Sequence, residues 1–143
     1  MLPLFDPPCQ SPTRTVVASA CRCGERCLWN GERRAKSTVI RRLEADGVRV
    51  VPVCPEMLGG LPCPRPPVKS KRGRVFETDP ETRKTFGAER TEEFTRGAET
   101  AVSIALGMGA TEAYLQRFSP SCSPTGIAGR AFAAAGIKVV PIW

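Results

Sequence analysis

At 143 residues, the chain is long enough for one domain with its own core and too short for two domains of ordinary size. Its apolar share of 41% and charged share of 24% are those of a soluble globular protein, and no apolar run could cross a bilayer, so we expect no membrane partner. The net charge of +7 leaves an anionic partner such as RNA or a nucleotide open, whereas the lack of histidine excludes imidazole-based zinc sites and histidine-dependent catalytic pairs.

The first predicted strand follows a proline-rich segment, residues 1–13, which we expect to be an extended or disordered lead-in. This segment lacks the basic and apolar regions of a secretory signal, so we expect a cytoplasmic protein. Residues 15–20 then form a short apolar run rich in β-branched side chains, which predicts a buried strand. The run stops at Cys21, so this cysteine is expected at the carboxyl end of the strand.

A helix and a second strand are predicted next. In residues 32–46, apolar side chains recur at helical spacing among basic ones, which predicts an amphipathic helix that stops at Gly47. Residues 48–53 form another apolar, valine-rich run, which predicts a strand. Like the first strand, it ends at a cysteine, Cys54.

The middle of the chain is expected to be loop-rich over residues 55–80, because prolines and adjacent glycines interrupt it. A basic cluster extends from Lys69 to Arg74 in this stretch. Residues 91–107 then have the spacing of a long helix, with Thr91 as its N-cap and Gly107 at its end.

The last part of the chain repeats the alternation of strand and helix. A third strand is predicted over residues 111–118, and it leads to Cys122. A short alanine-rich helix over residues 130–135 and a final strand over residues 137–142 close the sequence. Three cysteines therefore follow three predicted strands.

This alternation predicts an α/β fold, a single three-layer domain over residues 14–143 with a mostly parallel, doubly wound (Rossmann-like) sheet. In such sheets, ligands bind beyond the carboxyl ends of the strands, where the strand order reverses. We therefore expect Cys21, Cys54 and Cys122 to meet at one crevice, although they are far apart in the sequence.

The cysteine content favours metal binding or thiol chemistry over disulfides, since seven cysteines cannot all pair and the chain is expected in a reducing compartment. Cys21, Cys23 and Cys27 form a CxCxxxC pattern that matches no common zinc or ferredoxin spacing. For Cys23 and Cys27 we expect a place in a loop or the role of small core residues.

Two short motifs place polar groups beside the other cysteines. In Cys54-Pro55-Glu56, the proline stiffens the turn and Glu56 adds an acid or base to the expected crevice. In the segment 119–122, Ser119 and Ser121 put hydroxyls on the same tight loop as the cysteine. Taken alone, Glu56 is better explained as a surface glutamate at a strand end, and the serine segment as only a serine-rich turn.

Taken together, four motifs resemble the thiouracil desulfurase (TudS) family over residues 16–140. They are Ser19-Ala20-Cys21, Val53-Cys54-Pro55-Glu56 with the later Pro64-Arg65-Pro66, Thr91-x-x-Phe94-x-x-Gly97-Ala98, and Ser119-Pro120-Ser121-Cys122. The order of the CPE and SPSC motifs is more specific than either motif alone. The family's usual RYDG-like element is here Cys27-Leu28-Trp29-Asn30-Gly31.

The resemblance implies a [4Fe–4S] cluster held by Cys21, Cys54 and Cys122, with one iron left without a protein thiolate. That iron would bind the thiocarbonyl sulfur of a thiolated pyrimidine, of the 2-thiouracil or 4-thiouracil type, and oxygen would replace the sulfur. Glu56 is the candidate general base or proton shuttle, Ser119 would orient the base or the attacking water, and Ser121 is a weaker candidate.

Two alternatives stay open. The first is the same chemistry on 4-thiouridine in RNA, which the basic cluster favours mildly; since no second RNA-binding domain is evident, a free base or nucleotide is preferred. The second is a non-catalytic metal-binding or nucleic-acid-associated module in which the cysteines hold zinc structurally, with Cys23 or Cys27 as the fourth ligand. The sequence does not determine the oligomeric state.

Overall fold

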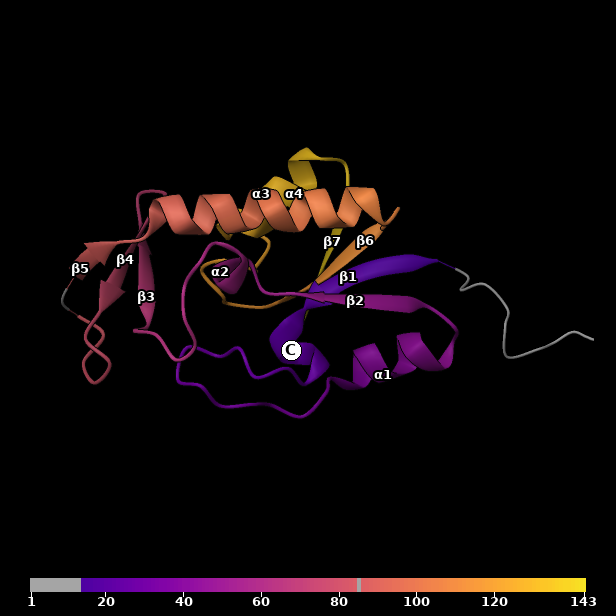
Figure 1. Cartoon of the computed structure of the whole chain (residues 1–143), viewed down its shortest axis with the longest axis horizontal. Helices are drawn as coiled ribbons and strands as arrows, with labels where there is room; N and C mark the ends of the chain where they lie inside the picture. The colour runs from indigo at the N-terminus through magenta and orange to yellow at the C-terminus, as the bar shows by residue number, and fades with distance from the viewer. Residues whose placement is uncertain (1–13, 85) are drawn as a thin grey trace, which may run out of the picture.

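The computed structural model describes residues 14–84 and 86–143 of the chain. The predicted lead-in, residues 1–13, lies outside the described residues. Figure 1 shows the elements, whose order is β1 (Thr15–Ser19), the 3₁₀ turn η2 (Ala20–Cys23), α1 (Thr38–Ala45), β2 (Arg49–Val53), α2 (Pro55–Leu58), β3 (Val68–Lys71), β4 (Arg74–Thr78), β5 (Phe86–Glu89), α3 (Thr91–Gly107), β6 (Glu112–Gln116), α4 (Ile127–Ala134) and β7 (Lys138–Ile142).

The larger sheet has four parallel strands in the order β2-β1-β6-β7. β1 pairs along its length with β2, from Thr15 opposite Arg49 to Ser19 opposite Val53. Its other edge pairs with β6, which the chain reaches later. The strand order therefore reverses beside β1, and this reversal is where a doubly wound sheet binds its ligands.

Helices cover both faces of this sheet, as the sequence predicts. In β1, Val17 packs on the face covered by α3 and α4, whereas Val16 packs on the opposite face with Ile40 of α1. This alternation follows from the period of two along a strand. Figure 1 shows α3 and α4 on one side of the strands and α1 on the other. The predicted three-layer α/β architecture is confirmed.

Glycines in α3 and α4 let these two helices pack closely against the segments that follow β2 and β6. A Cβ atom on Gly97 of α3 would lie 1.7 Å from the carbonyl oxygen of Pro55 in α2. A Cβ atom on Gly129 of α4 would lie 2.0 Å from the carbonyl oxygen of Ser123. Only glycine permits such close backbone packing, so these two contacts fix the segments that carry Cys54 and Cys122.

Predictions for three helices need correction; the last helix, predicted over residues 130–135, spans Ile127–Ala134. The helix predicted over residues 32–46 begins only at Thr38, because the Ser37 side chain accepts a hydrogen bond of 3.2 Å from the Val39 amide and caps it. The long helix spans Thr91–Gly107 as predicted, but Thr91 is not its N-cap. Its hydroxyl instead accepts a hydrogen bond of 2.8 Å from the amide of Val75 in β4.

The prediction that residues 55–80 are only loop-rich is wrong. This stretch contains α2 and two strands of a smaller antiparallel sheet, ordered β3-β4-β5. The hairpin between β3 and β4 turns at Arg72 and Gly73, whose φ values of 52° and 80° are those of a two-residue hairpin turn. The basic cluster therefore lies on a hairpin. Among the described residues, no helix is long and apolar enough to span a membrane.

Candidate active site

The three cysteines that follow the predicted strands line one pocket. Cys21 lies in the turn η2 directly after β1, and Cys54 caps the N-terminus of α2 directly after β2. Cys122 lies in the loop between β6 and α4. The expected convergence at the carboxyl ends of the parallel strands is therefore present in the structure, on both sides of the point where strand order reverses.

The thiols of Cys21 and Cys54 are biased toward the thiolate form. Hydrogen bonding with the Cys27 thiol is the largest influence on each, although its single hydrogen can stabilise only one of the two thiolates at a time; it lowers the pKa of Cys21 and brings the pKa of Cys54 down to about 7. The backbone amide of Met57, in the first turn of α2, also lowers the pKa of Cys54. Thiolate is the form of cysteine that binds metals, so these two residues are suited to metal coordination.

Cys122 differs because it is buried. Burial raises the pKa of Cys122 to about 12, although the Ser19 and Ser121 hydroxyls oppose this change. Such a thiol stays protonated unless a positive charge stabilises its thiolate, and a bound metal centre supplies that charge.

The donor set fits a group larger than a single metal ion. Among residues 14–84 and 86–143, no three cysteine, aspartate or glutamate side chains converge on one ion position. Four thiols nevertheless line the same pocket, those of Cys21, Cys54 and Cys122 and that of Cys27, and three thiolates on one pocket suit an iron–sulfur cluster. The zinc alternative named Cys23 or Cys27 as the fourth ligand; Cys27 does line the pocket, but among the described residues no such group is arranged to hold a single ion.

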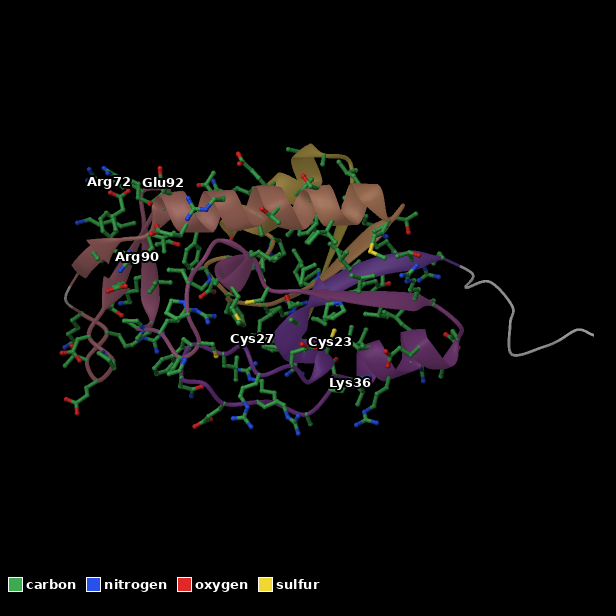
Figure 2. All side chains as sticks on the ribbon, in the orientation of Figure 1. Cys23, Cys27, Lys36, Arg72, Arg90 and Glu92 are labelled. Atoms are coloured by element: carbon green, nitrogen blue, oxygen red, sulfur yellow. The ribbon has the colours of Figure 1, made fainter. Side chains whose placement is uncertain are left out.

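Cys27 is a buried loop residue, as expected, and it also lines the pocket, which was not predicted. It is only 5% exposed and lies within hydrogen-bonding reach of Cys21 and Cys54. The CxCxxxC spacing was visible in the sequence, but the path of the loop that brings Cys27 back to Cys21 was not. Cys23, by contrast, packs against the core cluster on the α1 side, as predicted; Figure 2 shows the two cysteines apart.

The other two cysteines lie outside the predicted ligand set. Cys63 donates a hydrogen bond of 3.3 Å to the carbonyl oxygen of Leu28, so its thiol helps to hold the loop that carries Cys27. Cys9 lies outside the described residues. All six described cysteines are free of disulfides.

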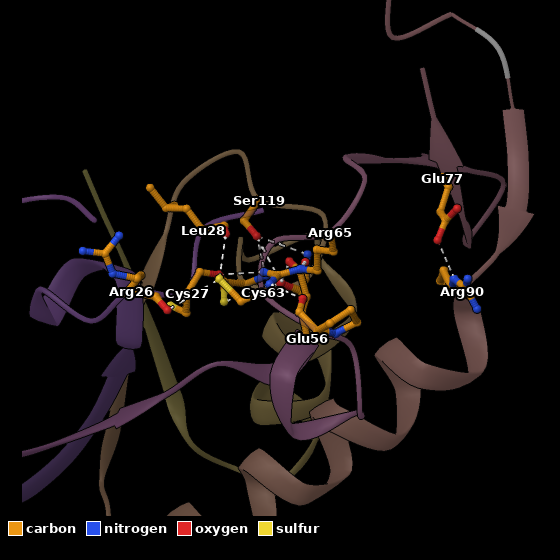
Figure 3. A network of polar contacts seen from close by, with 12 residues as sticks. Arg26, Cys27, Leu28, Glu56, Cys63, Arg65, Glu77, Arg90 and Ser119 are labelled. Atoms are coloured by element: carbon orange, nitrogen blue, oxygen red, sulfur yellow. Dashed lines mark hydrogen bonds and ion pairs between the residues drawn. The ribbon is translucent and has the colours of Figure 1, made fainter. Parts of the chain in front are cut away.

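Glu56 is held at both of its carboxylate oxygens. Oε1 accepts a hydrogen bond of 2.7 Å from Nε of Arg65, and Oε2 accepts one of 3.0 Å from the Ser121 hydroxyl (Figure 3). The Glu56 and Arg65 side chains are 15% and 5% exposed, so this is a largely buried ion pair. Arg65 belongs to the Pro64-Arg65-Pro66 motif, but the sequence analysis predicted no role for it.

The three predicted acid–base residues form one chain of hydrogen bonds. The hydroxyls of Ser119 and Ser121 lie 3.1 Å apart, and the Ser119 oxygen also accepts bonds from the amides of Ser121 and Cys122 at 3.3 and 3.1 Å. These two amides occupy the acceptor positions of Ser119, so its hydrogen is directed to Ser121, whose own hydrogen is directed to Glu56. A continuous hydrogen-bonded path therefore links Ser119 through Ser121 to Glu56.

The mouth of the pocket is basic and aromatic. Arg83 lies over the ring of Trp29 at 5.6 Å, and Arg117 lies over the ring of Trp143 at 5.1 Å. Besides the buried Arg65, five arginines line the pocket, namely Arg22, Arg33, Arg34, Arg83 and Arg117. The predicted basic cluster from Lys69 to Arg74 does not line the pocket.

Comparison with known proteins agrees with the predicted resemblance. A family model described as 2-thiouracil desulfurase matches residues 16–139. The uncharacterized protein YbbK of Bacillus subtilis (strain 168) is 34% identical over 110 residues, which cover 75% of this chain and 72% of YbbK. A solved structure described as the [4Fe–4S]-dependent thiouracil desulfidase TudS superposes with a TM-score of 0.77 at 30% identity, covering 90% of this chain and 91% of that one.

Proposed function

The chain belongs to the 2-thiouracil desulfurase family, and we propose from this membership that it replaces the thiocarbonyl sulfur of a thiolated pyrimidine by oxygen. The solved relative is a [4Fe–4S]-dependent thiouracil desulfidase, which is the same reaction class. The observation that carries the proposal is the meeting, in one pocket, of three strand-end cysteines with the Glu56, Ser121 and Ser119 chain.

In this proposal Cys21, Cys54 and Cys122 hold the [4Fe–4S] cluster. Two of these thiols have a lowered pKa and the third is buried, so the set provides three sulfur ligands on one pocket. When bound, the cluster would supply Lewis acidity toward the thiocarbonyl sulfur. The lack of histidine leaves sulfur as the principal donor type in the chain.

The remaining chemistry is hydrolysis without net redox change. Water adds to the thiocarbonyl carbon, the carbon–sulfur bond breaks, and the products are the ordinary carbonyl and hydrogen sulfide. One proton must leave the attacking water, and Ser119 with Ser121 provides a path for it to Glu56. Arg65 keeps the Glu56 carboxylate oriented as the end of that path.

The arginines at the mouth favour an anionic group on the substrate. Besides Arg65, five guanidinium groups line the pocket against the carboxylates of Glu32 and Glu56, and this excess of positive charge attracts phosphate, which a free base lacks. A thiolated nucleotide is therefore preferred to free 2-thiouracil or 4-thiouracil within this proposal. The proposed location is the cytoplasm, where free cysteines persist.

Thiolated RNA is the second candidate substrate. Phe118 and Trp143 are 82% and 68% exposed beside the pocket, and exposed aromatic rings next to arginines are suited to stacking on unpaired bases. The basic hairpin from Lys69 to Arg74 offers further phosphate contacts, but it is separate from the pocket lining.

The test is anaerobic reconstitution of the full chain with iron and sulfide, followed by assays on four substrates. These are 2-thiouracil, 4-thiouracil, a 4-thiouridine monophosphate and an RNA oligonucleotide that contains 4-thiouridine. We expect loss of the thiocarbonyl absorbance with equal release of sulfide, fastest for the monophosphate. A fully loaded cluster that turns over none of the four would refute the proposed function.

A further inference from the structure

Arg65 connects two walls of the pocket. Its Nε donates to Oε1 of Glu56 at 2.7 Å, and its Nη2 donates to the carbonyl oxygen of Cys27 at 2.8 Å. Its Nη1 donates to the carbonyl oxygen of Pro62 at 3.2 Å. One guanidinium group therefore bonds the acid–base residue and the loop that carries the fourth cysteine of the pocket (Figure 3).

The main chain of Arg65 reinforces the same connection. Its amide donates a hydrogen bond of 2.7 Å to the carbonyl oxygen of Trp29, two residues beyond Cys27. The loop from Cys27 to Trp29 is thus bonded by Arg65 through both its side chain and its backbone. Among the described residues, the Glu56 carboxylate is the single charged partner of the Arg65 guanidinium.

The hydrogen bonds of the Arg65 guanidinium group matter because this charged side chain is buried. The Arg65 side chain is 5% exposed, and a buried charge is tolerated only when it is paired and its donors are bonded. The planar fork of arginine suits this task, because it directs donors to three acceptors at fixed angles, whereas lysine would supply a compact charge with different geometry.

We propose that Arg65 is the positioning residue of this pocket, which holds the carboxylate of Glu56 and the Cys27 loop at a fixed separation. By occupying Oε1, it leaves Oε2 for the Ser121 hydroxyl, so the proton path has one orientation. By bonding the Cys27 carbonyl, it keeps that cysteine beside the ligand thiols. The first consequence rests on the proposed function, whereas the second does not.

Arg96 provides a matched control. Its Nη2 donates a hydrogen bond of 2.8 Å to the carbonyl oxygen of Gly59, at the end of the same helix α2 that carries Glu56. Arg96 does not line the pocket. If Arg65 acted only by anchoring α2, R96M would reproduce the effects of R65M.

The loop arm of the test measures alkylation of Cys27 by iodoacetamide in the full chain, as purified and after anaerobic reconstitution, with peptide mass spectrometry. Cys27 is 5% exposed in the wild type, so it should react slowly. We expect R65M to raise its labelling rate by about tenfold or more, and R96M to leave it unchanged. Equal labelling of Cys27 in R65M and wild type would overturn the proposal.

The kinetic arm uses R65K, R65M and E56Q in reconstituted protein whose circular dichroism matches the wild type. We expect R65M to lower kcat by about 10²-fold with a smaller change in KM, R65K to lie between, and R65M to add little in an E56Q background. Multiplicative losses in the double variant would overturn the positioning role. A wild type without desulfurase activity would instead refute the proposed function, and the labelling arm would still decide on Arg65.

Discussion

The hydroxyl of Ser121 lies 3.0 Å from Oε2 of Glu56, although 65 residues separate the two in the chain. Glu56 lies in α2, which follows β2, and Ser121 belongs to the loop after β6. β2 and β6 both pair with β1, so this contact links the segments that follow the two strands on either side of β1. The proposed acid–base residues are therefore brought together by the same parallel sheet that brings the cysteines together.

Replacing Glu56 by glutamine should separate proton transfer from cluster binding. We expect E56Q to lower kcat by between about 10²- and 10⁴-fold, because the amide cannot accept the proton from Ser121. Iron and sulfide content should stay at the wild-type level, since Glu56 is not among the proposed ligands. E93Q is the control, because Glu93 pairs with Arg90 on α3. A wild-type rate in E56Q would remove Glu56 from the mechanism.

Replacing each proposed ligand should abolish cluster assembly. We expect C21A, C54A and C122A each to bind almost no iron after reconstitution, because three thiolates are needed to hold the cluster. C23A is the matched control, since Cys23 packs against the α1 core. Iron analysis and the visible absorption spectrum report the outcome. Normal iron content in any of the three variants would show that its thiol is not a ligand.

The reactivity of the thiols should follow their pKa values in the cluster-free chain. The pKa of Cys54 is lowered to about 7, so its iodoacetamide labelling should reach half of its maximal rate near neutral pH. Burial raises the pKa of Cys122 to about 12, so Cys122 should stay unlabelled over the same range. In C27A the Cys54 midpoint should move upward, because the largest cause of its lowering is lost. An unmoved midpoint in C27A would contradict this account.

A methyl group at Gly97 should damage stability. G97A places its Cβ against the Pro55 carbonyl, so we expect the free energy of unfolding to fall by about 1–3 kcal/mol, with iron binding reduced as the Cys54 segment shifts. G107A is the control, because a Cβ there meets no atom within 4 Å. It should stabilise the protein by about 0.5–1 kcal/mol, as alanine does in helices. Urea denaturation measures both changes, and equal effects would argue against close packing of α2 on α3.

The arginines at the pocket mouth should act on charged substrates only. We expect R33Q and R117Q to raise KM about threefold to tenfold for a thiolated nucleotide, and to leave KM for the free base unchanged. Added salt should have the same selective effect, because it screens exposed charges. If both variants change KM equally for the nucleotide and the free base, these arginines do not recognise phosphate.

The sequence was most informative where regular structure determines position. Cys21 and Cys54 directly follow apolar runs, and parallel strands present their carboxyl ends at one edge, so their convergence could be predicted. The helix from Thr91 to Gly107 was equally clear from its spacing. These features depend on local pattern and general topology.

Features that depend on loop paths could not be predicted in this way. Cys27 reaches the pocket through an irregular segment, and its neighbours there are set by hydrogen bonds from Arg65 and Cys63, which lie far away in the sequence. The early start predicted for α1 ignored the Ser37 cap, and the hairpin at Arg72 and Gly73 lacked a common turn dipeptide. In each case a single contact or turn outweighed the average pattern.

The glycine contacts at Gly97 and Gly129 have a consequence for how this protein responds to heat. The loops of Cys54 and Cys122 rest directly on the backbones of α3 and α4, whose apolar sides form the main core. The pocket segments therefore pack directly on the main core, which is the part of the molecule expected to unfold cooperatively. On heating, the pocket segments should not unfold before the core does. Loss of activity and global unfolding should therefore occur at the same temperature.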